Sequence, residues 1–246
     1  MKNFKKKAAI AALSAFTFST MAFAGTAFAS LEMPTGFKPG EYTFIPAASS
    51  VSDLKNADGT DHWAKSQIQN MINLGAVKGY PDGTFQPEKP VTRAELASAM
   101  ANAMFLPKGE EVELPDVSST HWAAKNIATS LPYLAAFPDG SFRPNAPITR
   151  EEVAVAIVKA AGLDKKVVDP TILDVVFKDY KSVSPELRPL VAVALDQKLI
   201  LGVKDADGKL NVRAQDLVTR AEMAYLMDTA RTKIGLGYKV PGGSEE

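Results

Sequence analysis

Apolar residues recur at helical spacing in several short segments of the chain, and each stripe covers one side of a predicted helix. A short stripe runs from Ile68 to Gly75. Three longer stripes comprise Leu96, Ala99, Met100, Ala103 and Met104; Val153, Ala156, Ile157, Ala160 and Ala161; and Met223, Leu226, Met227, Ala230 and Ile234. Stripes of this width pack against a neighbouring helix, so the pattern predicts that the three longer helices share one core.

The same motif stands before each of the three longer stripes. Thr-Arg-x-Glu begins at Thr92, Thr149 and Thr219. A Pro-Asp-Gly loop precedes it in the first two copies and a looser Asp207-Gly208 turn in the third, while His-Trp-Ala stands further upstream at residues 62–64 and 121–123. This self-similarity predicts three tandem helix–loop–helix repeats. We place repeat 1 at 53–105, repeat 2 at 114–162 and repeat 3 at 176–234, with connectors between them.

Thr-Arg-x-Glu has a direct physical interpretation at the start of a helix. Threonine as N-cap and glutamate at the third helical position form a capping box, in which each side chain bonds the other residue's amide. Arginine then falls at the first helical position, where the helix dipole disfavours a cation. Two interpretations stay open: an anion site made by the amides and the guanidinium, or an arginine that pairs with a structural acid.

Residues 1–29 differ from the rest of the chain. Basic Lys2, Lys5, Lys6 and Lys7 precede an uncharged apolar stretch, and Ala27-Phe28-Ala29 has the small-x-small pattern of a signal-peptidase site. We therefore expect a signal peptide at 1–29 that is cleaved after Ala29, with Ala22-Phe23-Ala24 as a second possible site. Residues 30–52 are interpreted as an N-terminal extension and residues 235–246 as a mobile tail.

Charge and composition narrow the possible functions of the exported part. Removing residues 1–29 leaves 24 basic and 28 acidic residues, a net charge near −4, with no basic stripe for nucleic acid. No further apolar segment is long enough for a membrane span, and without cysteine the fold must be stabilised by packing alone. We expect no metal, cofactor or catalytic residue. His62 and His121 are interpreted as first-turn helix residues, and Asp205-x-Asp207-Gly208 as a turn rather than a calcium loop.

The ordered motifs together resemble the S-layer homology domain of bacterial surface proteins, across about residues 53–231. The resemblance implies an all-α, pseudo-trimeric, three-lobed body around a central three-helix bundle. It implies a non-enzymatic protein, secreted to the cell wall, whose partner is secondary cell-wall polymer bound through a pyruvate-ketal-bearing glycan in grooves between lobes. Two alternatives stay open: a self-associating S-layer lattice subunit and, with less support, an enzyme that modifies wall glycan.

The family's binding residues match eleven positions of this chain. They are Arg93, Arg150 and Arg220; Trp63 and Trp122; Gly75, Gly79 and Gly202; and Asp53, Asp116 and Asp179. The two tryptophans either pack on a sugar ring or anchor the core between lobes. Only repeat 1 keeps every feature, because repeat 2 lacks the glycines and has Pro132, and repeat 3 lacks the tryptophan. We expect Arg93 to contribute most to binding, and its removal to change the melting temperature little.

Overall fold

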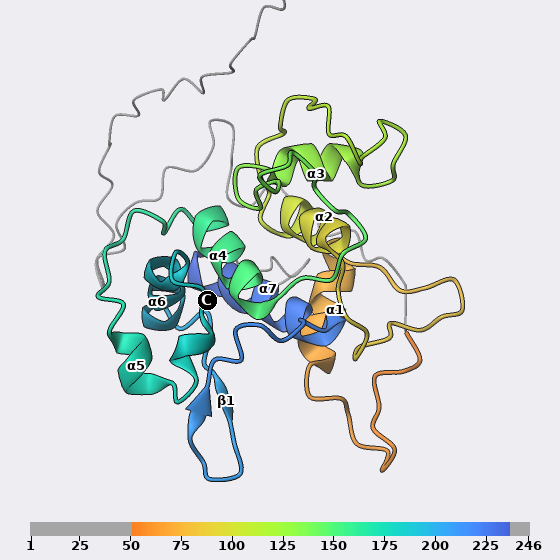
Figure 1. The fold of residues 1–246 in the computed structure, drawn as a ribbon. Coiled ribbons are helices and arrows are strands. Elements are labelled where there is room, and N and C mark those ends of the chain that lie inside the picture. Colours follow the sequence, from red (N-terminus) through yellow and green to blue (C-terminus); the bar gives the residue numbers. More distant parts are fainter. Residues whose placement is uncertain (1–50, 237–246) are drawn as a thin grey trace, which may run out of the picture. The chain divides into compact units, whose positions relative to one another are not determined.

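The computed structural model describes residues 51–236 (Figure 1). All described residues belong to one compact unit. The predicted signal peptide, almost all of the extension at 30–52 and most of the tail at 235–246 lie outside the described residues. Those expectations stay predictions.

The described part is predominantly helical, as the stripes predict. Its α-helices are α1 (Lys65–Asn73), α2 (Arg93–Ala103), α3 (Ala124–Ser130), α4 (Arg150–Ala160), α5 (Ile172–Val176), α6 (Arg188–Asp196) and α7 (Arg220–Lys233). A 3-10 turn, η1 (Tyr180–Ser182), follows α5, and an antiparallel hairpin of β1 (Val203–Lys204) and β2 (Leu210–Asn211) carries the Asp205 turn. None of the described helices combines the length and the apolar character needed to cross a bilayer.

The capping boxes predicted from sequence are confirmed in all three repeats. Thr92, Thr149 and Thr219 are the N-caps of α2, α4 and α7, and each pairs reciprocally with the glutamate at the third helical position. The arginines therefore occupy the first helical position, as expected. Pro132 also acts as predicted, because α3 ends at Ser130, two residues before it.

Each repeat packs its first helix mainly against the second helix of the preceding repeat. The chief pairs are α3 with α2, α6 with α4, and α1 with α7 (Figure 1). In addition, α2, α4 and α7 contact one another pairwise. The pair of α1 with α7 joins the first and last helices of the described chain. The apolar stripes are therefore buried between repeats, and the core is continuous from Leu54 to Ala230.

Backbone hydrogen bonds close the same cycle just before the three capping boxes. The Val91 amide donates to the Val218 carbonyl, Val218 donates to Ile148, and Ile148 donates to Val91, over distances of 2.9, 3.0 and 3.2 Å. All three side chains are fully buried. Each repeat thus supplies one donor and one acceptor to a ring that none can form alone.

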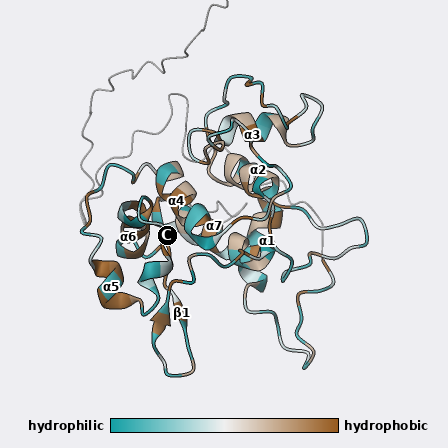
Figure 2. Ribbon diagram, in the orientation of Figure 1, coloured by the Kyte–Doolittle hydropathy of each residue, from teal (hydrophilic) through white to brown (hydrophobic). Residues whose placement is uncertain are grey.

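The connector between repeats 2 and 3 contains structure that the sequence did not predict. Helix α5 lies within it, and Figure 2 shows α5 as largely hydrophobic. Leu173 is buried in the core, but Val175 is 84% exposed. A five-residue helix is too short to show a 3.6-residue period, so the stripe analysis missed it.

Candidate carbohydrate-binding site

Three junctions between consecutive repeats collect most of the predicted site residues. Junction 1–2 is centred on Arg93, junction 2–3 on Arg150, and junction 3–1 on Arg220. At each one, the start of the second helix of one repeat meets the loop of the next repeat. The arginines come from helix starts that the capping boxes fix, so their positions are set by local sequence and their contacts by the neighbouring repeat.

Arg93 and Arg220 have buried guanidinium groups in which each of the three nitrogens donates a hydrogen bond. Arg93 donates to the Phe142 carbonyl at 2.8 Å and the Ala135 carbonyl at 2.7 Å, and its side chain is 3% exposed. Arg220 donates to the corresponding carbonyls of Phe85 and Lys78 at 2.8 and 2.7 Å. Desolvation lowers the pKa of Arg93, an effect that the negative charge of Glu152 opposes. The guanidinium stays protonated, because arginine is not deprotonated in proteins.

Each arginine also forms an ion pair with the capping-box glutamate of the next repeat. Arg93 pairs with Glu152 at 2.9 Å, Arg150 with Glu222 at 2.7 Å, and Arg220 with Glu95 at 3.0 Å. Each glutamate uses one oxygen for this pair and the other for the amide of its own N-cap threonine. The interpretation that each arginine pairs with a structural acid is therefore confirmed.

The helix amides that the anion-site interpretation requires are already engaged. The first two helical amides of α2, those of Arg93 and Ala94, donate to the Ala146 and Pro144 carbonyls of repeat 2 at 2.9 and 3.0 Å. The third, that of Glu95, donates to the Thr92 hydroxyl. Helices α4 and α7 repeat the pattern. Tertiary contacts therefore already use the amide donors that such an anion site would need. Whether the arginines contribute to ligand binding stays a prediction.

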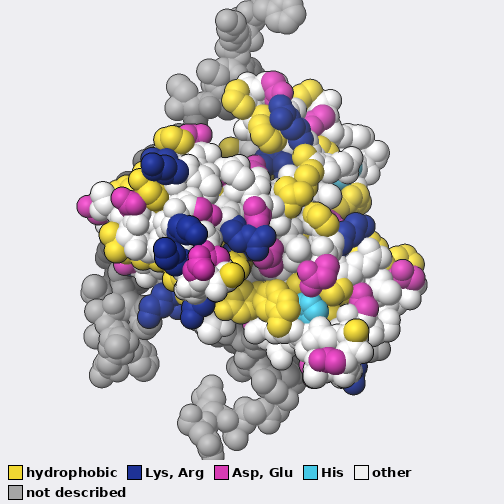
Figure 3. All heavy atoms as spheres, turned by 60° about the horizontal axis from the view of Figure 1, so that its bottom comes forward, with side chains coloured by type: hydrophobic (Ala, Val, Ile, Leu, Met, Phe, Trp, Pro, Cys, Tyr) yellow, Lys and Arg dark blue, Asp and Glu magenta, His cyan; other side chains and the backbone are white. Residues whose placement is uncertain are grey.

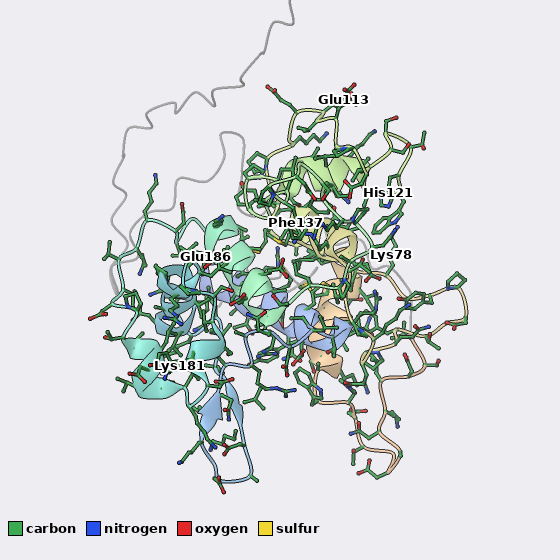
Figure 4. The ribbon with its side chains drawn as sticks, viewed as in Figure 1. Lys78, Glu113, His121, Phe137, Lys181 and Glu186 are labelled. Carbon is green, nitrogen blue, oxygen red and sulfur yellow. The ribbon has the colours of Figure 1, made fainter. Side chains whose placement is uncertain are left out.

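Two of the three guanidinium groups make cation–π contacts with aromatic rings. The Arg93 guanidinium carbon lies 4.6 Å from the ring centre of Phe137, which Figure 4 labels beside α2, and 4.9 Å from that of Phe142. Arg220 lies 4.9 Å from Tyr80 and 4.4 Å from Phe85. Motif alignment places Val203 and Val212 at these positions in repeat 3, so junction 2–3 has no corresponding ring. Arg150 is correspondingly more exposed, at 14%.

The three predicted aspartates hold the loops that receive the arginines. Asp53 accepts from the Phe85 and Gln86 amides, both at 2.7 Å. Asp116 accepts from the Phe142 and Arg143 amides and Asp179 from the Val212 and Arg213 amides, at 2.6–2.9 Å. The second residue of each amide pair has positive φ. Carboxylates that bridge two successive amides fix this strained turn, and a direct role in binding stays a prediction.

The two tryptophans lie on the surface. Trp63 is 58% exposed and Trp122 is 65% exposed, so the interpretation of either as a core anchor is wrong. They precede α1 and α3, where His62 and His121 each accept a hydrogen bond from the amide two residues on. The Trp63 ring also packs against Tyr225 of α7, with centroids 5.7 Å apart and planes tilted by 57°.

The three predicted glycines have different structural roles. Gly75 follows α1 with φ of 73° and lines a hollow of about 420 Å³ with Leu74, Ala101, Asn102, Phe105 and Leu106, near the opposite end of α2 from Arg93. A Cβ at Gly79 would lie 2.8 Å from a Val51 methyl group, and one at Gly202 would lie 2.5 Å from the Phe177 ring. Gly79 and Gly202 are therefore required for packing, and Gly75 is not part of the arginine junctions.

Sequence reasoning missed Lys89 and Tyr225, which lie around junction 3–1. Lys89 is exposed, and its ammonium lies 4.7 Å from the ring centre of Tyr80. Both residues fall outside the repeated motifs, so self-similarity gave no signal for them. Figure 3 shows hydrophobic side chains gathered beside a histidine on the face that this view brings forward.

Residues 51–236 contain no cluster of three or more histidine, cysteine or acidic side chains that is arranged to hold a metal ion. The predicted turn at Asp205 is confirmed. One carboxylate oxygen of Asp205 accepts from the amides of Asp207 and Lys209, and the other pairs with Lys178 at 3.3 Å.

Comparison with known proteins identifies the repeats. The S-layer homology domain model matches residues 57–97 and 113–154. Cell surface glycoprotein 1 of Acetivibrio thermocellus is 38% identical over 128 residues, which are 47% of this chain and 5% of that protein. The surface-layer 125 kDa protein of Lysinibacillus sphaericus is 27% identical over 74% of this chain and 15% of its own length. The cellulosome-anchoring protein of A. thermocellus is 34% identical over 55% of this chain and 32% of its length.

These matches and the capping-box repeats define a cell-surface protein that is associated with the cell wall. Two segments of the chain, residues 57–97 and 113–154, are matched directly as S-layer homology domains. Repeat 3 lies outside the matched segments but has the same capping box, arginine–glutamate pair and aspartate–amide contacts. The chain corresponds to between 5% and 32% of the length of these relatives.

Proposed function

We propose that this protein is a non-enzymatic anchor that binds secondary cell-wall polysaccharide non-covalently. The observation that most strongly supports this proposal is the pair of exposed tryptophans at equivalent positions of repeats 1 and 2. A large aromatic face held in water at two equivalent places matches what a sugar ring requires, because its apolar C–H face packs on aromatic carbon. The names of the cell-surface and cellulosome-anchoring relatives support the same function.

The proposed ligand is a polymer that carries pyruvate ketals on N-acetylmannosamine, as the family resemblance implies. Each ketal adds a carboxylate to the sugar, so binding needs cationic and aromatic groups together. Junctions 1–2 and 3–1 have both: an exposed cation over an aromatic ring, Arg143 over Phe137 and Lys89 over Tyr80, in a repeat pair that also contributes a surface tryptophan. In this proposal the eleven predicted residues form or support the binding surface, and the arginines and aspartates hold its loops.

We further propose that the three repeats form one pseudo-trimeric, three-lobed body around a central bundle of α2, α4 and α7. Three cyclic sets of contacts support this: helix pairs between repeats, arginine–glutamate pairs, and the backbone ring of Val91, Ile148 and Val218. Each set links every repeat once to the repeat before it and once to the repeat after it, in a closed cycle. A three-fold arrangement satisfies all of them together.

Binding to isolated wall sacculi tests the proposed function. The purified protein should co-sediment with sacculi that retain their non-peptidoglycan polymer and stay in the supernatant once that polymer has been stripped. Trp63→Ala combined with Trp122→Ala should reduce co-sedimentation about tenfold or more, since stacking of this type contributes about 1–2 kcal/mol per ring. Val175→Ala, which truncates another exposed apolar side chain on α5, is the matched control and should bind normally.

The same preparations separate the alternatives. A lattice subunit would assemble into sheets without sacculi, and this candidate has support from the surface-layer relative. An enzyme would release soluble glycan fragments with time. Equal binding to intact and stripped sacculi would contradict recognition of the secondary polymer.

A further inference from the structure

The connector between α4 and α5 contains an exposed stretch without regular structure, residues 166–169. Val167 in this stretch is 98% exposed. The amides of Val167 and Val168 donate to no other described residue, and the Lys166 carbonyl accepts a hydrogen bond from none. Exposed loops are the preferred sites of proteolytic cleavage, and an added strand pairs through backbone groups that are not already hydrogen-bonded. The backbone around Lys166 meets both requirements.

Two lysines give this stretch a side-chain chemistry that selects a class of protease. Lys165 and Lys166 are both exposed, and neither forms an ion pair with a described residue. A lysine before the cleaved bond is recognised by a carboxylate in the protease's specificity pocket. Of the two bonds that follow a lysine here, Lys166–Val167 is the more accessible. The Lys166 amide donates to the Leu163 carbonyl at 3.0 Å, whereas the Val167 amide has no such bond.

The connector between α2 and α3 also has an exposed lysine, but the bond that follows it is fixed. This bond joins Lys108 to Gly109, whose amide donates to the Thr129 hydroxyl at 3.3 Å. Gly109 packs so closely on α3 that a Cβ there would collide with the Ala128 carbonyl oxygen. The acidic Glu110 follows, and an acidic pocket repels it. The two connectors therefore differ in the accessibility of the peptide bond and not in the presence of lysine.

Repeat 3 is held to the rest of the molecule by contacts that do not pass through residues 166–169. The Glu151 carboxylate of α4 accepts from the Ser184 amide and hydroxyl at 2.9 and 2.6 Å, and from the Gln215 amide group at 2.8 Å. Helix α4 packs on α6, and α7 packs on α1. A cut in this stretch would remove the covalent link between repeats 2 and 3 but none of these contacts.

We infer that Lys166–Val167 is a cleavage site for a lysine-specific endoprotease, and that the two products stay associated. In the cleavage, water adds across the peptide bond, so that Lys166 gains a carboxylate and Val167 a free amino group. Folding of the intact chain is unimolecular, whereas the cleaved protein can separate into two pieces, which makes its stability depend on protein concentration. Cleavage would thus convert a continuous chain into one that can lose its third repeat. The inference does not depend on the proposed polysaccharide ligand.

Limited digestion of the full chain with a lysine-specific endoprotease, followed by mass measurement, tests the site. The first cut inside residues 51–236 should fall between Lys166 and Val167. Lys165→Gln combined with Lys166→Gln should slow this first cut about tenfold or more, because cleavage elsewhere in this range must await local unfolding. Lys108→Gln is the matched control from the other connector, and should leave the rate unchanged. Thermal melts of the variants establish that their folds are intact.

The cleaved protein tests the second half of the inference. It should elute with the intact protein in size-exclusion chromatography, and its urea midpoint should fall on dilution while that of the intact protein stays constant. A first cut at Lys108 or at any other bond inside residues 51–236 would overturn the assigned site, as would an unchanged rate in the double variant. Separation of the pieces without denaturant would overturn their association. Failure of the intact protein to bind sacculi would remove the proposed function and leave this inference standing.

Discussion

Single residues at the junctions combine two tasks that are usually separate. Glu95, Glu152 and Glu222 cap their own helices with one oxygen and neutralise a neighbour's arginine with the other. Because the guanidinium groups of Arg93 and Arg220 are almost fully buried, the loss of the partner glutamate leaves an unpaired positive charge away from water. That cost exceeds the net gain from the intact pair.

Arg93→Ala should therefore destabilise the protein, in contrast to the expectation from sequence that its melting temperature would change little. Removal leaves Glu152 and two carbonyls without their donors, a cost of about 2–4 kcal/mol. Arg150→Ala should cost less, because this more exposed arginine makes one carbonyl contact and lies on no aromatic ring. Urea unfolding curves measure the difference. Equal stability of Arg93→Ala and the unmodified protein would contradict the burial argument.

Asp139 gives a pH-dependent test of the loop in repeat 2. Hydrogen bonds from Ser141, first from its hydroxyl and then from its amide, and from Arg143 lower the pKa of Asp139 to about 2. Since the folded pKa lies below the ordinary value of 3.8, any stabilisation from this group is present above pH 3.8 and is lost as the pH falls toward 2. Carboxyl chemical shifts should titrate near pH 2 in the unmodified protein and at higher pH in Ser141→Ala. Identical titration curves would show that the hydroxyl does not stabilise the charge.

At the scale of elements, the loops that join the short helices depend on glycines, and two glycines of repeat 3 show this. The Gly202 backbone has φ of 74°, and its missing side chain leaves room for the buried Phe177 ring. Gly208, in the hairpin turn of the same repeat, has φ of 76° but open space around it. The two glycines thus share a backbone conformation and differ only in packing.

Gly202→Ala should be clearly more destabilising than Gly208→Ala. Both substitutions place an alanine at positive φ, which costs about 1 kcal/mol, but only the first forces a displacement of Phe177, which adds about 1–3 kcal/mol. Chemical denaturation of the two variants gives the comparison directly. Similar losses for both would indicate that Phe177 moves aside at little cost.

At the scale of the whole molecule, stability comes from contacts between repeats. Helix α1 finds its main partner in α7, at the other end of the described chain, and the arginine pairs and the backbone ring link every repeat to the next. The first helix of each repeat packs mainly on a helix of another repeat, so no repeat completes a core from its own helices. Its two short helices are too short to be stable without tertiary packing.

A fragment of residues 53–105 should therefore be largely unfolded, whereas residues 30–234 should melt in one transition. Circular dichroism at 222 nm measures the first expectation, and coincident thermal transitions from two probes measure the second. A helical, cooperatively melting fragment would show that a repeat is stable without its neighbours. Mixing the fragment with residues 106–234 offers a further control, since complementation should restore helix only if α1 docks on α7.

The sequence by itself determined the local elements of this protein. Capping boxes, the Pro-Asp-Gly turns and the stop at Pro132 depend on residues within a few positions of one another. The repeated motifs also carried the resemblance to the S-layer homology domain. Tertiary structure alone decided which partner each local element meets. The Thr-Arg-x-Glu pattern cannot show that the helix amides donate to carbonyls of the next repeat, or that each arginine meets the next repeat's glutamate. The exposure of Trp63 and its contact with Tyr225 likewise depend on the pairing of α1 with α7, because residues so far apart in the chain are brought together only by the closure of the core.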